Sequence, residues 1–254
     1  MEQITYLGLF LLSLLVIPTL MVNRFLEIRL NSQIVQAMIR MFVQLFVVGI
    51  YLKYIFEWDN NLLNLAYILV MELIATSSTL RGIQIKNRKL FFPLFLTVMV
   101  PNLALIFFFN FILLRLGWIL PARYVITIGG MLLGNVLNGN IVGLNTFYNG
   151  IKANQEILNY ELTLGATLFQ ACKPHISNAL TLTIKPTIAS MATLGLVALP
   201  GMMTGQILGG ALPSDAIMYQ IAIMIAIYLN RYFTIIGGLG VFMRYLFDCN
   251  DQLV

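Results

Sequence analysis

The sequence predicts an all-α membrane protein with about seven transmembrane helices, an outside N-terminus and a cytoplasmic C-terminus. The chain has 254 residues, of which 59% are hydrophobic and only 10% charged, whereas an average soluble domain carries roughly 25% charged residues. Its apolar runs reach the length of about 20 residues that a helix needs to cross a bilayer. One run, residues 193–210, is interrupted by proline and glycine, which indicates a helix broken at membrane depth beside a pathway.

The predicted spans follow the apolar runs in order along the chain. The first run has no basic segment before it and no small-residue cleavage site after it, so we interpret it as a span and not as a signal peptide. No repeat or linker divides the chain, and we expect a single transmembrane domain over residues 1–254. The predicted spans are 4–22, 34–56, 62–80, 91–114, 124–144, 187–208 and 216–239.

Lysines and arginines in the loops orient these spans. The loop 81–89 carries four of them, and the loop after the first span carries two. Short cytoplasmic loops are enriched in Lys and Arg, so we expect both loops on the cytoplasmic side. The long connection 145–186 is then also cytoplasmic, and its residues 147–164 predict an amphipathic helix near the membrane surface.

The residue pattern excludes several function classes. No phosphate-binding loop of the form GxxxxGK[ST] is present, and the lone His175 has no nucleophile or carboxylate beside it in the sequence. The basic residues are scattered, so no nucleic-acid-binding face is expected. We expect no enzymatic activity, no catalytic residue and no cofactor bound by this chain. The broken span favours transport as the function. If the chain moves a cargo against its gradient, the energy comes from a partner protein or from an ion gradient.

The charged residues away from the C-terminal end of a predicted span are Arg40, Glu72 and Arg231. A charge within a membrane by default marks a functional site or an internal ion pair. Arg40 lies early in its span, so its side chain could equally extend to the membrane surface. Glu72 lies near the middle of the third span. A pair between Glu72 and either arginine is therefore our hypothesis.

The fifth span combines asparagines with closely spaced glycines. Asn135 and Asn138 lie among five glycines, four of which form pairs spaced four residues apart. Such pairs permit close approach of helices, and asparagines at membrane depth need polar partners. Two interpretations stay open: tight packing with amide cross-links, or the polar wall of a pathway.

The sixth span carries the candidate gate. Pro200 and Gly201 interrupt it, and Met202 and Met203 follow directly. Thioethers are soft ligands that suit copper(I) better than harder iron ions, while methionine is also a common gap-filler of apolar cores. Met202 and Met203 are therefore candidate metal ligands, with packing as the alternative.

Residues 161–171, ELTLGATLFQA, resemble the cytoplasmic coupling segment of ABC-transporter permeases, whose core reads LGA-[ST]-x-x-QA. The resemblance implies a short helix between spans that docks on a separate ATPase subunit. The residues it assigns to coupling are Glu161, Leu164, Gly165, Ala166, Thr167, Gln170 and Ala171.

Residues 193–205 and 215–221 resemble the FetB-type permeases, which include bacterial iron exporters and membrane subunits of plant aluminium-tolerance transporters. Arg40 with Gln44, and Gly134 with Asn135, also match. The resemblance implies a homodimeric permease. Because no targeting peptide is recognised, a bacterial plasma (inner) membrane and an organellar membrane are both expected locations. The resemblance also implies a cognate ABC ATPase partner that binds ATP and Mg, with iron as the exported cargo.

The run LNRY at residues 229–232 departs from the small and hydroxyl residues that such sequences carry in the last span. Arg231 near a pathway would repel a free cation, so an organic anion such as a nucleotide sugar is the alternative cargo. A gradient-driven transporter that uses Glu72 is another alternative. A membrane scaffold without transport is the last, and the broken sixth span argues against it.

Overall fold

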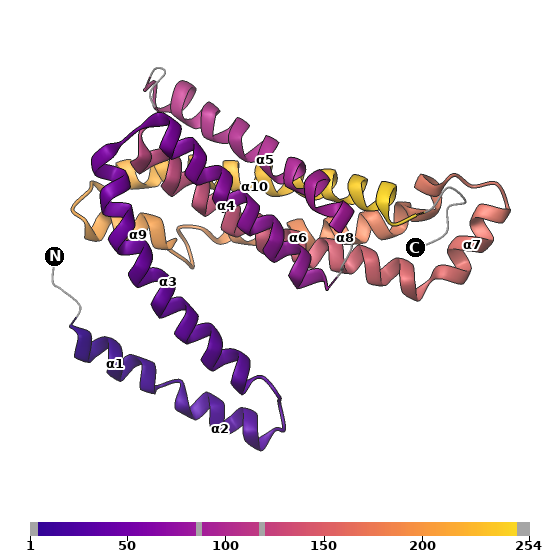
Figure 1. Ribbon diagram of the computed structural model, residues 1–254, viewed down its shortest axis with the longest axis horizontal. Coiled ribbons are helices and arrows are strands. Elements are labelled where there is room, and N and C mark those ends of the chain that lie inside the picture. The colour runs from indigo at the N-terminus through magenta and orange to yellow at the C-terminus, as the bar shows by residue number, and fades with distance from the viewer. Residues whose placement is uncertain (1–4, 85–87, 117–119, 248–254) are drawn as a thin grey trace. The chain divides into compact units, whose positions relative to one another are not determined.

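The computed structural model describes residues 5–84, 88–116 and 120–247, and every element in these ranges is a helix (Figure 1). The chain divides into an N-terminal unit, Met1–Trp58, and a C-terminal unit, Asp59–Val254. An all-α membrane protein is confirmed. Six segments of the described chain are long and apolar enough to cross a membrane: Tyr6–Phe25, Asn31–Trp58, Asn61–Ile83, Phe91–Leu113, Ala122–Ala153 and Pro213–Tyr245.

The N-terminal unit consists of two short helices, which together form the first membrane-length segment, and one long helix. The first predicted span is divided just before Pro18, whose ring disfavours a continuous helix, and its predicted start, Ile4, lies outside the described residues. Asn31 joins the two parts of the unit because its Nδ2 donates to the main-chain oxygen of Leu20 over 2.9 Å. The helices are α1 (Tyr6–Leu14), α2 (Ile17–Phe25) and α3 (Asn31–Trp58).

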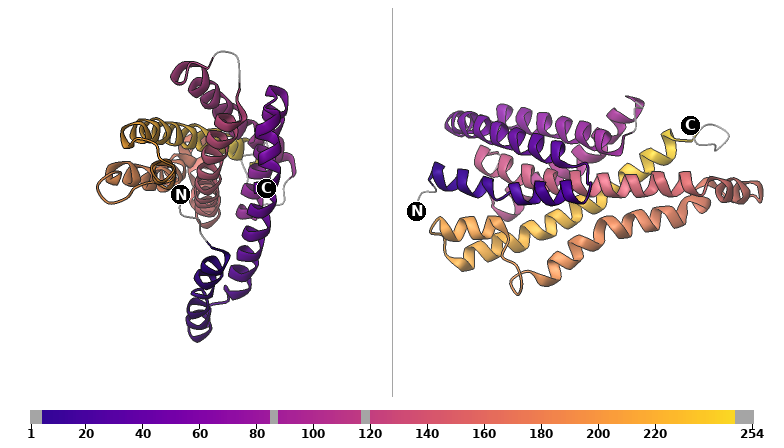
Figure 2. Two further views of the ribbon diagram at one scale, coloured as in Figure 1. Left: turned by 90° about the vertical axis from the view of Figure 1, so that its left-hand side faces the viewer. Right: turned by 90° about the horizontal axis from the view of Figure 1, so that it is seen from below.

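The C-terminal unit is a bundle in which α6 is central and packs against α4, α8 and α10 (Figures 1 and 2). Glycines on α6 make this packing close. A Cβ atom at Gly129 would lie 2.6 Å from Cδ1 of Ile68, and one at Gly143 would lie 2.5 Å from Cδ1 of Ile235. The bundle helices are α4 (Asn61–Ile83), α5 (Phe91–Phe108), α6 (Ala122–Ala153), α8 (Leu168–Thr193) and α10 (Pro213–Tyr245).

Helix α6 is longer than predicted, and the prediction of one amphipathic helix over residues 147–164 is wrong. Phe147 and Ile151 are fully buried, in the same apolar cluster as Leu90 and Phe242. Their burial extends α6 to Ala153. A separate helix, α7 (Gln155–Thr163), follows after Asn154.

The sixth predicted span, 187–208, is not a single helix, and six membrane-length segments are found where we expected seven. Helix α8 ends at Thr193, and the short α9 (Gly201–Leu208) begins after a loop. Gly195 takes φ +79° there, a conformation that favours glycine, and its N–H donates to the carbonyl of Ala198 over 3.1 Å. The predicted interruption is confirmed, but as a loop with its own main-chain hydrogen bonds and not as a kink at Pro200.

Helices α7 and α9 lie at opposite ends of the C-terminal unit (Figures 1 and 2). The end that carries α7 also holds the end of α4 with Arg81, joined to α6 by a hydrogen bond from Asn145 Nδ2 to the carbonyl of Gly82. The 3-10 turn η1 (Arg88–Leu90) leads into α5 there, and Lys86 lies outside the described residues. The most basic loop is therefore at the α7 end. Which side of the membrane this end faces stays a prediction.

Candidate functional site

A layer of polar side chains crosses the apolar core of the C-terminal unit. Glu72 of α4, Asn102 of α5 and Asn230 of α10 are each 0% exposed. Asn102 Nδ2 donates to Oε1 of Glu72 over 2.9 Å, and Asn230 Nδ2 donates to Oδ1 of Asn102 over 3.2 Å. The Thr234 hydroxyl completes the chain by donating to Oδ1 of Asn230 over 3.5 Å. We call these four residues the polar layer.

Apolar side chains enclose the polar layer on both sides. Ile68 and Ile106, one turn from Glu72 and Asn102, belong to one buried cluster, whereas Ala75 and Val98 on the other side belong to a second. Of the polar layer only Glu72 is among the residues that the sequence predicts. The signal that could have identified Asn102 and Asn230 is a polar side chain within an apolar span.

Arg231 of α10 lies next to Asn230 in sequence but contacts other helices. Its Nε and Nη2 donate to the main-chain oxygen of Asn135 over 3.2 and 2.7 Å. Its Nη1 donates to the hydroxyl of Thr187 on α8. A Cβ atom at Gly139 would lie 2.8 Å from Nε, so glycine makes room for the guanidinium. Arg231 thus joins α6, α8 and α10.

The hypothesis of a Glu72–Arg231 ion pair is wrong. Within the described residues, the Glu72 carboxylate has Asn102 as its hydrogen-bond donor, and Arg231 binds Asn135 and Thr187. The two charged groups therefore have different environments, although both lie inside membrane-length helices. Pairing of Glu72 with Arg40 stays a prediction, and Arg40 itself is exposed on α3 of the N-terminal unit.

The asparagines of α6 have different surroundings. Asn135 is partly buried, its Nδ2 donates to the carbonyl of Met131 over 2.9 Å, and its own carbonyl binds Arg231. Asn138 and Gly134 are exposed, and a Cβ atom at Gly134 would meet no atom within 4 Å. Asn135 therefore braces the bundle, whereas Asn138 lies on an open face of α6.

The predicted gate residues lie at the start of α9. Pro200 is the N-cap of this helix and Gly201 its first residue. Met203 is buried, and the partly buried Met202 packs against the apolar cluster that includes Ile223. These contacts favour packing for both methionines. No cluster of three or more His, Cys, Asp or Glu side chains able to hold a metal occurs in the described part of the chain.

The segment that follows α7 forms a rigid corner. Gly165 takes φ +92°, and its N–H donates to the carbonyl of Leu162 over 3.0 Å. The N–H of Ala166 donates to the carbonyl of Glu161 over 3.1 Å. These two bonds define a Schellman motif, the common termination of a helix by glycine. The Leu-Gly-Ala part of the predicted coupling segment is therefore the C-cap of α7.

The rest of that segment begins α8. The Thr167 hydroxyl accepts a hydrogen bond from the N–H of Gln170 over 3.3 Å, and Oε1 of Gln170 accepts from the N–H of Thr167 over 2.8 Å. This is a capping box. Ala171 is buried in the core, while Leu164 and Phe169 are 69% and 58% exposed. The corner is thus fixed in shape and presents apolar side chains at its tip.

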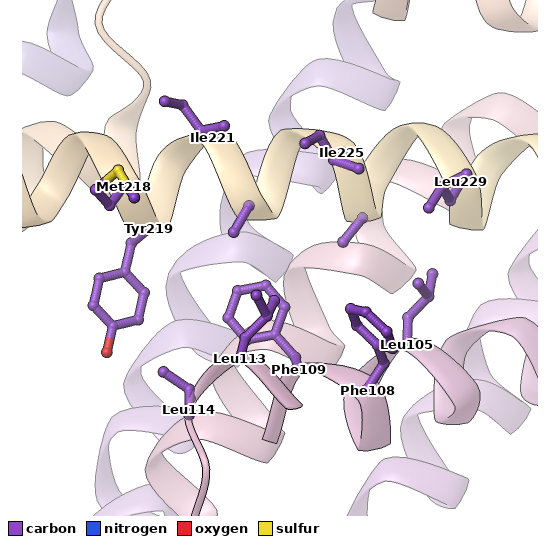
Figure 3. Close-up of a pocket in the computed structure, with 12 residues that line it drawn as sticks. Leu105, Phe108, Phe109, Leu113, Leu114, Met218, Tyr219, Ile221, Ile225 and Leu229 are labelled. Carbon is purple, nitrogen blue, oxygen red and sulfur yellow. The ribbon is translucent and has the colours of Figure 1, made fainter. Parts of the chain in front are cut away.

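A groove of about 580 Å³ lies between α10 and the end of α5, where the π-helix η2 (Phe109–Leu113) continues the chain. Figure 3 shows Phe108, Phe109 and Leu113 on one side of it and α10 with Ile225 on the other, with the Tyr219 ring at one end. None of the described residues that line it is charged. The groove therefore does not suit an ionic cargo.

Comparisons with known proteins are consistent with this picture. The model of the UPF0014 family, described as "Uncharacterised protein family (UPF0014)", matches residues 6–247. The UPF0014 membrane protein YjkA of Bacillus subtilis (strain 168) is 34% identical over 220 residues, which are 86% of this chain and 86% of the relative.

Two further relatives have functional names. Protein ALUMINUM SENSITIVE 3 of Arabidopsis thaliana is 32% identical over 199 residues, covering 78% of this chain and 71% of the relative. The "Probable iron export permease protein FetB" of Escherichia coli (strain K12) is 31% identical over 259 residues, covering 100% of this chain and 96% of the relative. No solved structure matches the chain. The resemblance to FetB-type permeases is thereby confirmed.

Proposed function

The chain belongs to the UPF0014 family of membrane proteins, and on that premise we propose that it is the permease subunit of an ABC transporter. It forms a homodimer in a bacterial plasma membrane or an organellar membrane and works with two copies of a separate ATPase. It binds no cofactor itself, because ATP and Mg belong to the ATPase. The cargo is iron, moved outward, as the name of the Escherichia coli relative suggests.

The observation that supports this proposal most is the corner between α7 and α8. Its backbone is held by the Schellman motif at Gly165 and the capping box of Thr167 and Gln170. A docking element has to move as a rigid body, because a flexible one would absorb the displacement that it receives. Leu164 and Phe169 present the apolar surface that a groove on an ATPase would bury.

The corner is connected directly to the polar cluster of Arg231. Helix α8 spans 26 residues from the corner to Thr193, a length of about 39 Å at about 1.5 Å per residue. On the way, Thr183 packs against Gly143 and Thr187 binds Arg231. ATP-driven closure at the corner would thus shift α8 against α6 and α10. The loop after Thr193, with Pro200 and α9, is the element that yields, and we assign it as the gate.

Arg231 favours a second cargo, an organic anion such as a nucleotide sugar. A guanidinium has five N–H donors, and three hydrogen bonds from Arg231 are found, one to the Thr187 hydroxyl and two to the Asn135 carbonyl. Its partners are neutral oxygens, so the positive charge is not neutralised by a described carboxylate. A half-buried charge of this kind attracts an anion and repels a free cation.

The first test measures ATPase activity of the chain in liposomes with its candidate ATPase, titrated with ferrous iron and then with nucleotide sugars. Stimulation by iron supports the metal exporter. Stimulation by the sugars alone moves the assignment to the anion. If no complex with the ATPase forms, the ABC assignment is overturned, and a gradient-driven transporter using Glu72 becomes the leading alternative.

Substitutions at the corner sharpen the test. Leu164→Asp and Phe169→Asp change exposed side chains, so the fold should persist while complex formation falls by tenfold or more, equivalent to about 1.4 kcal/mol or more. Asn159→Asp is the matched control, because it adds the same charge to an exposed position of α7. Gly165→Val strains the left-handed residue by about 1–2 kcal/mol and should uncouple hydrolysis from transport. Transport unchanged in all three corner variants would contradict the coupling assignment.

A further inference from the structure

The turn of α4 from Glu72 to Thr76 holds two buried oxygen atoms without hydrogen-bond partners. Glu72 is 0% exposed and Thr76 is 1% exposed. Oε2 of Glu72 and Oγ1 of Thr76 make no hydrogen bond to any described group. Leaving such a group unpaired costs about 1–3 kcal/mol, and more where the group is charged. The two atoms belong to side chains that lie one turn apart on the same helix.

The neighbouring Thr79 shows that a buried threonine hydroxyl of this helix can find a main-chain partner. Thr79 is also buried, yet its hydroxyl donates to the carbonyl of Ala75 over 3.0 Å. This bond to the residue four positions earlier is the usual solution for threonine in a helix. Thr76 does not form the equivalent bond, so its hydroxyl oxygen is available to another ligand.

The hydrogen bonds of the polar layer are all oriented toward the carboxylate of Glu72. Each donor in the chain from Thr234 through Asn230 and Asn102 points its hydrogen toward the next acceptor, and the chain ends on Oε1 of Glu72. Donors aligned in this way stabilise negative charge on the carboxylate. A buried carboxylate keeps its charge only with a positive charge close by, because its desolvation costs several kcal/mol, and without one it takes up a proton. An ordered water would satisfy both oxygens but would not supply that charge.

We propose that Glu72 and Thr76 bind one small monovalent cation, with Na⁺ as the ion to test. The ligands would be the carboxylate oxygen of Glu72 and the hydroxyl oxygen of Thr76, and oxygen ligands suit hard cations. Hard cations of this size take oxygens at about 2.3–2.6 Å, so two ligands on opposite sides lie up to about 5 Å apart. Residues four apart on a helix lie on one face with their Cβ atoms about 5–6 Å apart, so the two side chains are able to reach one ion.

Charge balance selects a monovalent ion. The described stretch of α5 has no ionisable side chain, and those of α6 (Arg123, Tyr124, Tyr148 and Lys152) lie near its ends. On α4 the others are Tyr67 and Arg81, and on α10 the nearest, Arg231, binds Asn135 and Thr187. Within these four helices, Glu72 therefore offers a single negative charge without a cationic partner. A divalent ion would leave a net positive charge in the core.

The bound cation would compensate the charge of Glu72 at the end of the polar layer and so stabilise the contacts that hold α4, α5 and α10 together. This inference does not depend on the proposed ATPase, so its failure would leave the transport proposal intact. Likewise, a chain without an ATPase partner could still bind the ion.

The experiment measures thermal unfolding of the purified chain in detergent, with choline chloride replaced stepwise by NaCl, LiCl or KCl at constant ionic strength. We expect the melting temperature to rise with Na⁺ and to saturate, by roughly 3–5 °C at about ten times Kd. Glu72→Gln and Thr76→Val should abolish the rise, whereas Thr79→Val should retain it. Without Na⁺, Thr76→Val should be at least as stable as the wild type, because an unpaired hydroxyl has been removed.

Three results would overturn the proposal. The first is a wild-type melting temperature that is the same in sodium and choline. The second is a sodium response that persists in Glu72→Gln. The third is stabilisation by acid, lost in Glu72→Gln, with no response to any of the three cations, which would assign a proton instead. Equilibrium binding of ²²Na⁺ to the wild type, expected at one ion per chain, decides the matter even if the variants do not fold.

Discussion

The polar layer and the cluster around Arg231 meet α10 at adjacent residues, Asn230 and Arg231, yet they differ in burial and in the kind of hydrogen-bond partner. Glu72, Asn102 and Asn230 are completely buried and bind one another through side-chain amides. Arg231 is half-buried and binds a main-chain carbonyl and a hydroxyl, next to the open face of α6 that carries Asn138. One cluster is closed to solvent, and the other is partly exposed.

This difference follows from which face of each helix the neighbours cover. On α6, Gly129 and Gly143 contact side chains of other helices so closely that a methyl group would not fit, whereas Gly134 has open space. Burial strengthens each hydrogen bond of the closed cluster and makes each missing one costly. The same substitution should therefore have a large effect in the polar layer and a small one on the open face.

The largest effect is expected from Asn102→Leu. This change removes the amide donor to Glu72 and the acceptor of Asn230, and leaves a buried carboxylate uncompensated, so the free energy of unfolding should fall by about 3–5 kcal/mol. Denaturant unfolding in detergent measures it. Asn138→Leu, on the exposed face of α6, is the matched control and should change stability by less than about 1 kcal/mol. Equal losses in the two variants would contradict the distinction between closed and open clusters.

The next effect concerns the two kinds of glycine on α6. In Gly143→Ala the new methyl group would lie 2.5 Å from Cδ1 of Ile235, and such overpacking costs about 1–3 kcal/mol. Gly134→Ala should be neutral or stabilising by up to about 1 kcal/mol, because alanine favours the helix and meets no neighbour. The comparison uses thermal unfolding of both variants. Destabilisation of Gly134→Ala would indicate a contact on this face, for example with a second subunit.

Arg231→Lys tests the accessible cluster at smaller cost to the fold. Lysine keeps the positive charge but lacks the planar fork that binds the Asn135 carbonyl through two nitrogens. We expect a loss of about 1–2 kcal/mol in stability and a roughly tenfold fall in transport per folded molecule, since one charge-assisted hydrogen bond is worth about 1.5–3 kcal/mol. Arg244→Lys, near the end of α10, serves as control. Unchanged transport in Arg231→Lys would make the residue purely structural.

The smallest effect is expected from Met202→Leu and Met203→Leu. Both side chains pack against apolar neighbours, and exchanges of similar volume cost less than about 1.5 kcal/mol. Iron-stimulated ATPase activity should stay unchanged if these methionines serve packing alone. Lost stimulation with unchanged stability would instead assign a sulfur contact to the metal ion.

The sequence predicted the transmembrane segments well because a bilayer imposes a length and a composition that a single helix has to satisfy alone. The predicted spans 62–80 and 216–239 lie within α4 and α10 for this reason. The end of α6 was not predicted, because Phe147 and Ile151 are buried by other helices and not by lipid. Local composition does not distinguish these two environments.

The candidate site was predicted in part. Glu72 and Arg231 were conspicuous as charges in apolar runs, and the coupling segment through its likeness to a family. Asn102 and Asn230 were not predicted, although each is a polar side chain within an apolar span, because the sequence does not show which distant side chain each of them binds. The capping residues Thr167 and Gln170 carry a signal that the sequence does contain, since a threonine followed three residues later by glutamine predicts a helix start.

By itself, the sequence determined that this chain is an all-α membrane protein, that one of its predicted spans is broken near Pro200, and that the charges of Arg40, Glu72 and Arg231 lie inside its helices. These properties depend only on residues close together in the sequence, because the bilayer selects each span by its own length and composition, and proline and glycine interrupt a helix where they stand. The tertiary structure alone decided that Glu72 binds Asn102 and not Arg231, and that Arg231 joins α6, α8 and α10. Such pairings are set by which faces of distant helices meet, and that depends on close contacts such as those at Gly139 and Gly143.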